Sequence, residues 1–156
     1  MHSSFEIVVH MTGEITKLRE RTGAGVMDCK KAREEAGGDV EKAVAIIHER
    51  GFSKAEKKKD RATGAGLLHT YIHNGRVGVL LCIRCETDFV ARGEDFKNLA
   101  HDIVMQIAAM DPQDIEALLA QNFVKEESIT IEARIAKTIA KLGENIKIEK
   151  FCRYEI

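Results

Sequence analysis

Apolar residues recur along this chain with two different periods, and each period predicts a different kind of element. Over residues 94–110 they recur at every third or fourth position, which is typical of one face of an amphipathic helix. That face collects Phe96, Leu99, Ile103, Ile107 and Met110. The same period predicts a short helix over residues 114–120 and a longer amphipathic helix over residues 130–143.

A β-hairpin is predicted before the first of these helices. Asn74-Gly75 separates the apolar-rich runs "LLHTYIH" and "RVGVLLCIR", and this dipeptide is the strongest short-range signal for a two-residue turn. Such a turn pairs His73 with Arg76 and so fixes which side chains share a face. The expected core face carries Leu68, Thr70, Ile72, Val77, Val79, Leu81 and Ile83. The opposite face is expected to carry His69, Tyr71 and His73.

A third strand is predicted over residues 145–156. Its alternation of apolar and polar residues begins at Ile146 and Ile148 and then slips at Glu149-Lys150, so we expect a β-bulge there. Together with the hairpin, this strand completes a small antiparallel sheet. The helix over residues 94–110 is expected to cover the core face of the hairpin.

Helical signals also fill the first third of the chain. They are "EITKLRER", "VMDCKKAREEA", which stops at Gly37-Gly38, and "VEKAVAIIHER", which Asp39 caps and Gly51 is expected to end. The predicted fold class is therefore α+β, with an N-terminal three-helix bundle followed by a small antiparallel three-stranded sheet packed with helices.

The chain divides into four predicted segments. Residues 1–10 share no pattern with the rest and are interpreted as an extension, and residues 11–52 form the three-helix domain. Residues 53–65 are rich in lysine and are interpreted as a solvated basic linker, with a local contact to nucleic acid or the ribosome as the alternative. Residues 66–156 form the core domain.

The balance of charges argues against one class of function. With 24 lysines and arginines against 25 aspartates and glutamates, the net charge is −1, so the chain lacks the positive field of nonspecific nucleic-acid binders. No stretch reaches the length of a membrane span, and four cysteines are too few for a secreted disulfide scaffold. We expect a cytoplasmic protein with reduced thiols that binds neither membranes nor specific nucleic acids.

Pairs of cysteines and histidines give only weak signals for chemistry. Cys82 and Cys85 lie three positions apart on a predicted strand, so they project to opposite faces and are not expected to share a metal ion. His69 and His73 share a face but lie too far apart to chelate a metal easily. The loop "TGAG" lacks the residues of a phosphate-binding loop. These observations favour a binding protein rather than an enzyme, without cofactor or metal.

Three blocks of the sequence resemble elongation factor Ts, the guanine-nucleotide exchange factor for elongation factor Tu. They are "LRERTGAGVMDCKKAREEAGGDVEKA" at 18–43, "CETDFVAR" at 85–92 and "IAKLGENIKIEKFCRYE" at 139–155. The blocks occur in the family's order and span nearly the whole chain after Met11. The resemblance implies that the helical bundle is a ubiquitin-associated-like domain and that residues 66–156 are the dimerisation or core domain of such a factor.

The resemblance also implies two sets of partner contacts. The segment from Thr87 to Val90, with Asp88 and Phe89 at its centre, is expected to intrude beside the magnesium site of elongation factor Tu and to promote release of GDP. In the N-terminal domain the matching contacts fall at Arg19, Val26 and Met27. Val26 stands where many family members have methionine, so this contact stays apolar but is shorter.

One departure from the family leads to a hypothesis about assembly. Between Met110 and Ile129 the chain carries only "DPQDIEALLAQNFVKEES", where longer relatives have a second core subdomain and a helical hairpin. We therefore expect either weaker binding as a monomer or a homodimer that restores contact area. The candidate surface comprises His69, Tyr71, Phe151 and Cys152.

Two alternative functions stay open at this point. The chain could be a ubiquitin-associated-like adaptor that binds other proteins through "TGAGVMD" without exchange activity. It could also be an enzyme that uses Cys82 and Cys85.

Overall fold

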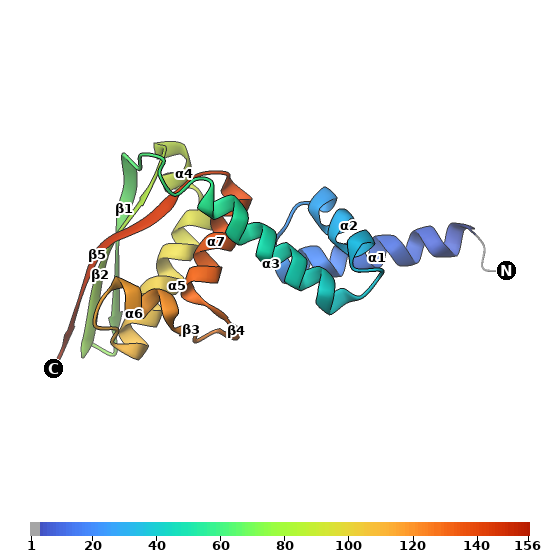
Figure 1. Ribbon diagram of the computed structural model, residues 1–156. Coiled ribbons are helices and arrows are strands. Elements are labelled where there is room, and N and C mark those ends of the chain that lie inside the picture. Colours follow the sequence, from blue (N-terminus) through green and yellow to red (C-terminus); the bar gives the residue numbers. More distant parts are fainter. Residues whose placement is uncertain (1–3) are drawn as a thin grey trace.

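The computed structural model describes residues 4–156, and the side chains from residue 12 onward. The molecule has two parts, a helical bundle and a sheet covered by helices, and the long helix α3 joins them (Figure 1). Helix α1 begins at Ser4, so residues 4–10 continue the first helix. Residues 1–3 lie outside the described residues, and the interpretation of residues 1–10 as an extension stays a prediction.

The N-terminal bundle consists of α1 (Ser4–Thr22), α2 (Val26–Glu35) and α3 (Val40–Glu56). Its core is small and comprises Leu18, Cys29, Ala32, Ala43 and Ile47. Gly37 and Gly38 both adopt positive φ after α2, and the carboxylate of Asp39 accepts a hydrogen bond from the Lys42 amide at 3.0 Å. The predicted turn and cap are therefore confirmed.

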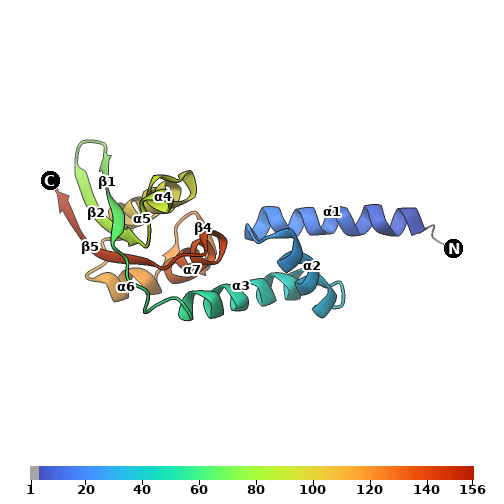
Figure 2. The ribbon, with the colours of Figure 1, turned by 90° about the horizontal axis from the view of Figure 1, so that it is seen from above.

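Helix α3 runs past the glycine that was expected to end it. Gly51 is buried inside the helix, which continues to Glu56. Along this stretch α3 packs against α7 (Ile131–Leu142) of the core domain (Figure 2), and this burial outweighs the roughly 1 kcal/mol that an interior glycine costs. A cavity of about 50 Å³ remains at this junction, next to the loop that joins α1 and α2.

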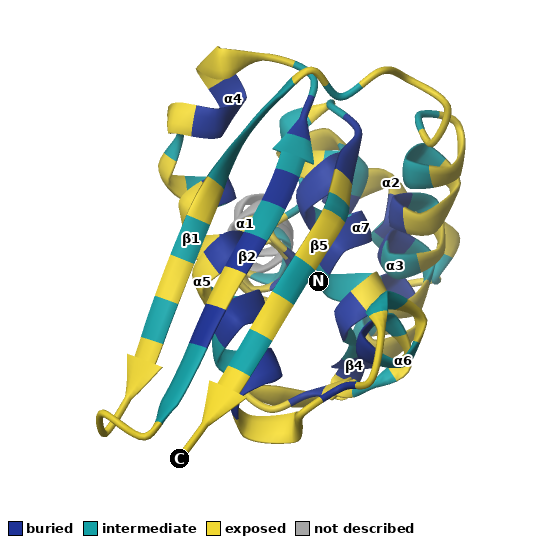
Figure 3. Ribbon diagram, turned by 90° about the vertical axis from the view of Figure 1, so that its left-hand side faces the viewer, coloured by how far each residue is buried: buried dark blue, intermediate teal, exposed yellow. Residues whose placement is uncertain are grey.

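The core domain is built on a three-stranded antiparallel sheet in the order β1-β2-β5. Its strands are β1 (Ala65–His73), β2 (Val77–Cys85) and β5 (Ile146–Glu155). The helices lie behind one face of this sheet, and no described helix covers the other face, which is seen in front in Figure 3. Opposite Cys82 and Ile83, strand β5 skips Glu149, so the predicted β-bulge is confirmed.

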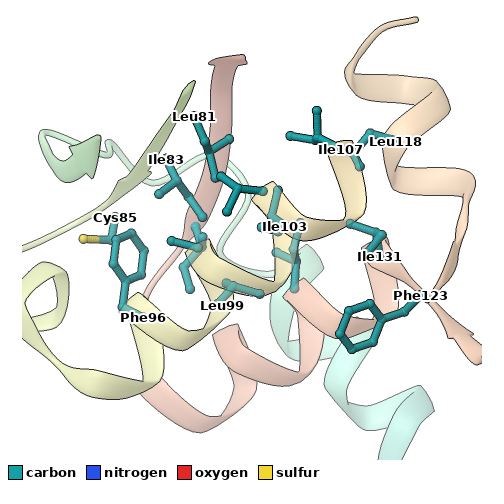
Figure 4. Close-up of a cluster of buried hydrophobic side chains, with 14 of the residues drawn as sticks. Leu81, Ile83, Cys85, Phe96, Leu99, Ile103, Ile107, Leu118, Phe123 and Ile131 are labelled. Carbon is teal, nitrogen blue, oxygen red and sulfur yellow. The ribbon is translucent and has the colours of Figure 1, made fainter. Parts of the chain in front are cut away.

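The main core lies between the sheet and the helices α5 (Glu94–Met110), α6 (Ile115–Ala120) and α7. Figure 4 shows Leu81, Ile83 and Cys85 of β2 facing the buried side of α5. The predicted apolar face of α5 is buried except for Met110, which is exposed at the end of the helix. A two-stranded ribbon of β3 (Asn122–Phe123) and β4 (Glu126–Thr130), which the sequence did not predict, places Phe123 in the same core.

The predicted face of β1 is wrong because the hairpin loop is one residue longer than expected. Asn74 and Gly75 do adopt positive φ, but Arg76 also belongs to the loop, and His73 pairs with Val77. A shift of one residue moves every side chain of a strand to the other face. Leu68 and Ile72, expected in the core, are each 66% exposed.

The same shift turns the other residues of β1 towards the helices. Leu67 and Tyr71 pack against the main core, and a ring nitrogen of His69 lies 3.4 Å from one of His101 on α5. The predicted core face of β2 is confirmed, since Val79, Leu81 and Ile83 are buried.

Candidate functional site

The segment after β2 forms a short helix, α4 (Asp88–Arg92), which the sequence analysis did not predict as a helix. Thr87 caps it, because the Thr87 hydroxyl accepts a hydrogen bond from the Val90 amide at 3.4 Å. Asp88 lies in the first turn, where a negative charge suits the helix dipole. A threonine followed by an aspartate was therefore a helix-start signal that could have been used.

Helix α4 presents one aromatic side chain to solvent and buries its other face. Phe89 is 87% exposed, whereas Val90 and Ala91 are 7% and 6% exposed and belong to the main core. Phe96, seven positions further on, is fully buried in that core. Phe89 therefore does not pack beneath α5.

The four predicted residues of this site therefore occupy different environments. Asp88 and Phe89 are exposed, and the Asp88 carboxylate forms no ion pair with any other described residue. Val90 is buried beneath them, and Thr87 lies at the helix cap. The structure brings the four residues together in one turn. Thr87, Asp88 and Phe89 are all exposed, but the Thr87 hydroxyl is already engaged at the cap.

The connection between α7 and β5 supplies a carboxylate to this turn that the sequence analysis missed. Glu144 follows Gly143, the left-handed residue that ends α7. Its Oε2 accepts hydrogen bonds from the amides of Glu86 and Thr87, each at 3.1 Å. Its Oε1 accepts a hydrogen bond from the Thr87 hydroxyl at 2.6 Å. A polar residue directly after a helix-ending glycine was the only available signal, and sequence separation hid its partners.

The cysteine before the turn has a structural environment. The Cys85 thiol is buried and lies 3.2 Å from the carbonyl oxygen of Thr87, to which it donates. Burial raises the pKa of the Cys85 thiol, with a smaller contribution from the nearby Glu144 carboxylate. The thiol therefore stays protonated near neutral pH and supports the turn as a weak donor.

The second predicted site lies in the bundle, where α1 ends and α2 begins. Val26 and Met27 are 49% and 61% exposed, and Arg19 is exposed on the last turn of α1. Gly25 precedes α2 without a side-chain cap. The three residues lie on either side of the loop that joins α1 and α2, in the bundle, whereas α4 belongs to the core domain (Figure 1).

A lysine from the core domain holds the loop of this second site. Lys137 on α7 donates to the carbonyl oxygen of Arg21 at 3.1 Å, close to the left-handed Gly23. Burial lowers the pKa of the Lys137 amine. The loop is therefore supported from outside its own bundle.

The cysteine and histidine pairs do not form a metal site. Cys82 donates to Glu149 at 3.5 Å on the uncovered face, whereas Cys85 is buried on the other face, so the expected projection to opposite faces is confirmed. Among the described residues, no group of three or more metal-ligating side chains comes together. Nor is any described helix long and apolar enough to cross a membrane.

Comparison with known proteins identifies relatives along most of the chain. A sequence model described as "Elongation factor TS" matches residues 86–156. Elongation factor Ts of Thermotoga petrophila is 41% identical over an alignment that covers 91% of this chain and 94% of the relative. Elongation factor Ts of Gloeothece citriformis is 39% identical over 94% of this chain and 68% of the relative.

Relatives of this kind differ in length. Elongation factor Ts of Nostoc is 44% identical over 91% of this chain, but that alignment covers only 45% of the relative. The chain therefore spans nearly the whole of the Thermotoga relative and less than half of the Nostoc one.

Proposed function

The chain belongs to the elongation factor Ts family and is a translation elongation factor that exchanges guanine nucleotide on elongation factor Tu, and we propose that it does so by inserting Phe89 beside the partner's magnesium site. The observation that carries this proposal is the 87% exposure of Phe89 above two buried neighbours. An aromatic side chain costs free energy when it is left in water, and here the fold holds it there on a fixed mount.

The proposed mechanism depends on the strict geometry of magnesium. The ion requires near-ideal octahedral coordination and neutralises phosphate charge, so a modest displacement of its supporting residues weakens nucleotide binding. Phe89 acts as a rigid apolar wedge, and the exposed Asp88 carboxylate, which has no ion pair within the described part of the chain, is available to hold the displaced groups by hydrogen bonds. Thr87 and Val90 contribute indirectly, because they fix the turn that carries Asp88 and Phe89.

No bond has to form or break for this activity. By linkage, the factor weakens nucleotide binding to its partner as much as nucleotide weakens binding of the factor. The factor therefore speeds the approach to equilibrium in both directions without covalent chemistry. We expect it to act in the cytoplasm, where translation takes place.

The N-terminal site is proposed to supply affinity for elongation factor Tu, rather than to displace the groups around its magnesium ion. Val26 and Met27 offer exposed apolar area, and Arg19 offers an exposed positive charge in the last turn of α1. A ubiquitin-associated-like adaptor without exchange activity is not favoured, because the elongation factor Ts family model matches residues 86–156 of the core domain and relatives of that family align over most of the chain.

A homodimer remains part of the proposal, with a different surface from the one that the sequence indicated. His69 and Tyr71 turn towards α5, and Phe151 packs against the main core, whereas Cys152 is exposed on the uncovered face of the sheet. That face also exposes Leu68, Ile72, Leu80 and Tyr154. We propose that a second copy covers these residues, and a strictly monomeric mass in light scattering at high protein concentration would refute this.

The test of the exchange mechanism is the release of labelled GDP from elongation factor Tu. We expect the Asp88→Ala, Phe89→Ala double variant to lose most of its acceleration, and Phe89→Leu to retain part of it because apolar bulk is kept. Met110→Ala is the matched control, since Met110 is also exposed but lies at the far end of α5. Normal exchange by the double variant would refute the wedge mechanism.

A further inference from the structure

We propose that Glu144 is a positioning residue for Phe89, because its carboxylate fixes the chain where β2 passes into α4. This inference rests on the proposed function, since it assigns a role in orienting the wedge. Glu144 itself follows α7, so a segment far away in the sequence holds the residue that is expected to enter the partner.

Helix α4 cannot hold its own orientation. It is five residues long, far below the length at which a helix is stable in isolation. Burial of Val90 and Ala91 holds its lower side. The N-terminal end, which carries Asp88 and Phe89, has no such burial and depends on hydrogen bonds at the cap.

Both carboxylate oxygens of Glu144 accept hydrogen bonds from the chain at the N-terminal end of α4. The amides of Glu86 and Thr87 converge on Oε2 at 3.1 Å each, and the Thr87 hydroxyl donates to Oε1 at 2.6 Å. Hydrogen bonds from neutral donors to a carboxylate are about twice as strong as those between neutral groups. The hydroxyl that caps α4 is therefore itself held in place by Glu144.

A second carboxylate makes the contact reciprocal. Glu86 accepts a hydrogen bond from the backbone amide of Asn145 at 2.7 Å, so each strand end offers a side chain to the backbone of the other. The ladder between β2 and β5 ends at the pair Cys85 and Ile146, and these side chains continue the connection beyond it. Rotation of α4 away from the sheet would require breaking both sets of bonds.

Hydrogen exchange of the free protein tests the positioning role without any partner. In Glu144→Ala, the amides of Glu86, Thr87 and Val90 should exchange faster, while those in the middle of β2 and β5 keep their wild-type rates. Glu132→Ala is the matched control, since Glu132 is an exposed glutamate in the first turn of α7, at the opposite end of the helix from the one that Glu144 follows. Unchanged exchange at the three amides in Glu144→Ala would overturn the inference.

GDP release from elongation factor Tu tests the consequence for function. At saturating factor we expect Glu144→Ala to accelerate release about tenfold to a hundredfold less than wild type, as misplacement of a reacting group does in other systems. The concentration of factor needed for half-maximal effect should change much less. Glu144→Gln, which keeps one acceptor oxygen, should recover part of the rate.

A double variant separates the failure of this inference from the failure of the proposed function. If Glu144 acts through Phe89, adding Glu144→Ala to Phe89→Ala should slow release no further. Fully additive losses, or wild-type release by Glu144→Ala when Phe89→Ala is slow, would overturn the positioning role alone. Wild-type release by Phe89→Ala would overturn the proposed function, and the positioning role with it.

Discussion

The two exposed sites of this molecule are supported in different ways. Helix α4 lies on the main core, where Val90 and Ala91 are buried and Glu144 binds the cap. The loop before α2 lies on a bundle whose buried core, among the side chains that the structure describes, has five small or medium members, and it relies on Lys137 from the core domain for one of its contacts. The first site is part of a large packed unit, and the second depends on its neighbour.

This difference suggests a division of work between the sites. A wedge that displaces another protein's side chains must resist being pushed back, so it needs a rigid mount. A site that contributes affinity can tolerate more movement, because the apolar contacts it makes with a partner do not depend strongly on direction. The core domain is therefore suited to exchange, and the bundle is suited to binding.

The largest expected effect comes from Phe96, a fully buried phenylalanine of the main core. Phe96→Ala should lower the free energy of unfolding by about 3–5 kcal/mol, because it removes a fully buried ring from the main core. Phe89→Ala should change it by less than about 0.5 kcal/mol, since the Phe89 side chain is largely in water already. Urea denaturation measures both values, and similar losses in the two variants would show that Phe89 is also a core residue.

A smaller effect is expected at the bundle site. Met27→Ala should weaken the complex with elongation factor Tu by about 1 kcal/mol, roughly fivefold in the dissociation constant, because it removes exposed apolar area. The rate of GDP release at saturating factor should stay close to wild type.

Titration of the complex together with release at saturation measures these two quantities. Val124→Ala is a suitable control, since Val124 is also an exposed apolar residue but lies in the core domain. A Met27→Ala variant that binds normally but releases GDP slowly would reverse the proposed division of work.

The smallest effect concerns the junction between the two parts. Burial lowers the pKa of His48 on α3, and the neighbouring Lys137 lowers it further. The ordinary pKa of a histidine is about 6.5, so below that pH His48 takes up a proton more readily in the unfolded chain than in the folded chain. The stability that His48 contributes is therefore present above that pH and is lost as the pH falls towards the lowered pKa.

Hydrogen exchange measured between pH 7 and pH 5, after correction for the intrinsic rate, tests this. Amides of α3 near His48 should lose protection in acid before those of β2 do, and His48→Gln should reduce the difference. Equal loss of protection in both elements would show that the bundle and the core domain respond to acid as one unit.

The hairpin shows where sequence patterns are reliable and where they are not. Strand β2 was predicted correctly because its apolar residues alternate on one face and that face is buried. Strand β1 has apolar residues on both faces, so its pattern fits either register. Arg76, which lies in the loop rather than in the strand, decided the register, and nothing local marks that difference.

Local patterns were sufficient to predict the fold class, the amphipathic helices α5 and α7, the β-bulge and the family, because periodic burial and specific motifs are local properties of the chain. The face of β1, the continuation of α3 past Gly51 and the contact of Glu144 with Thr87 became apparent only in the folded arrangement. Each of these depends on contacts between segments far apart in the sequence. Their free energy of packing or hydrogen bonding outweighs the local preference that a sequence pattern records.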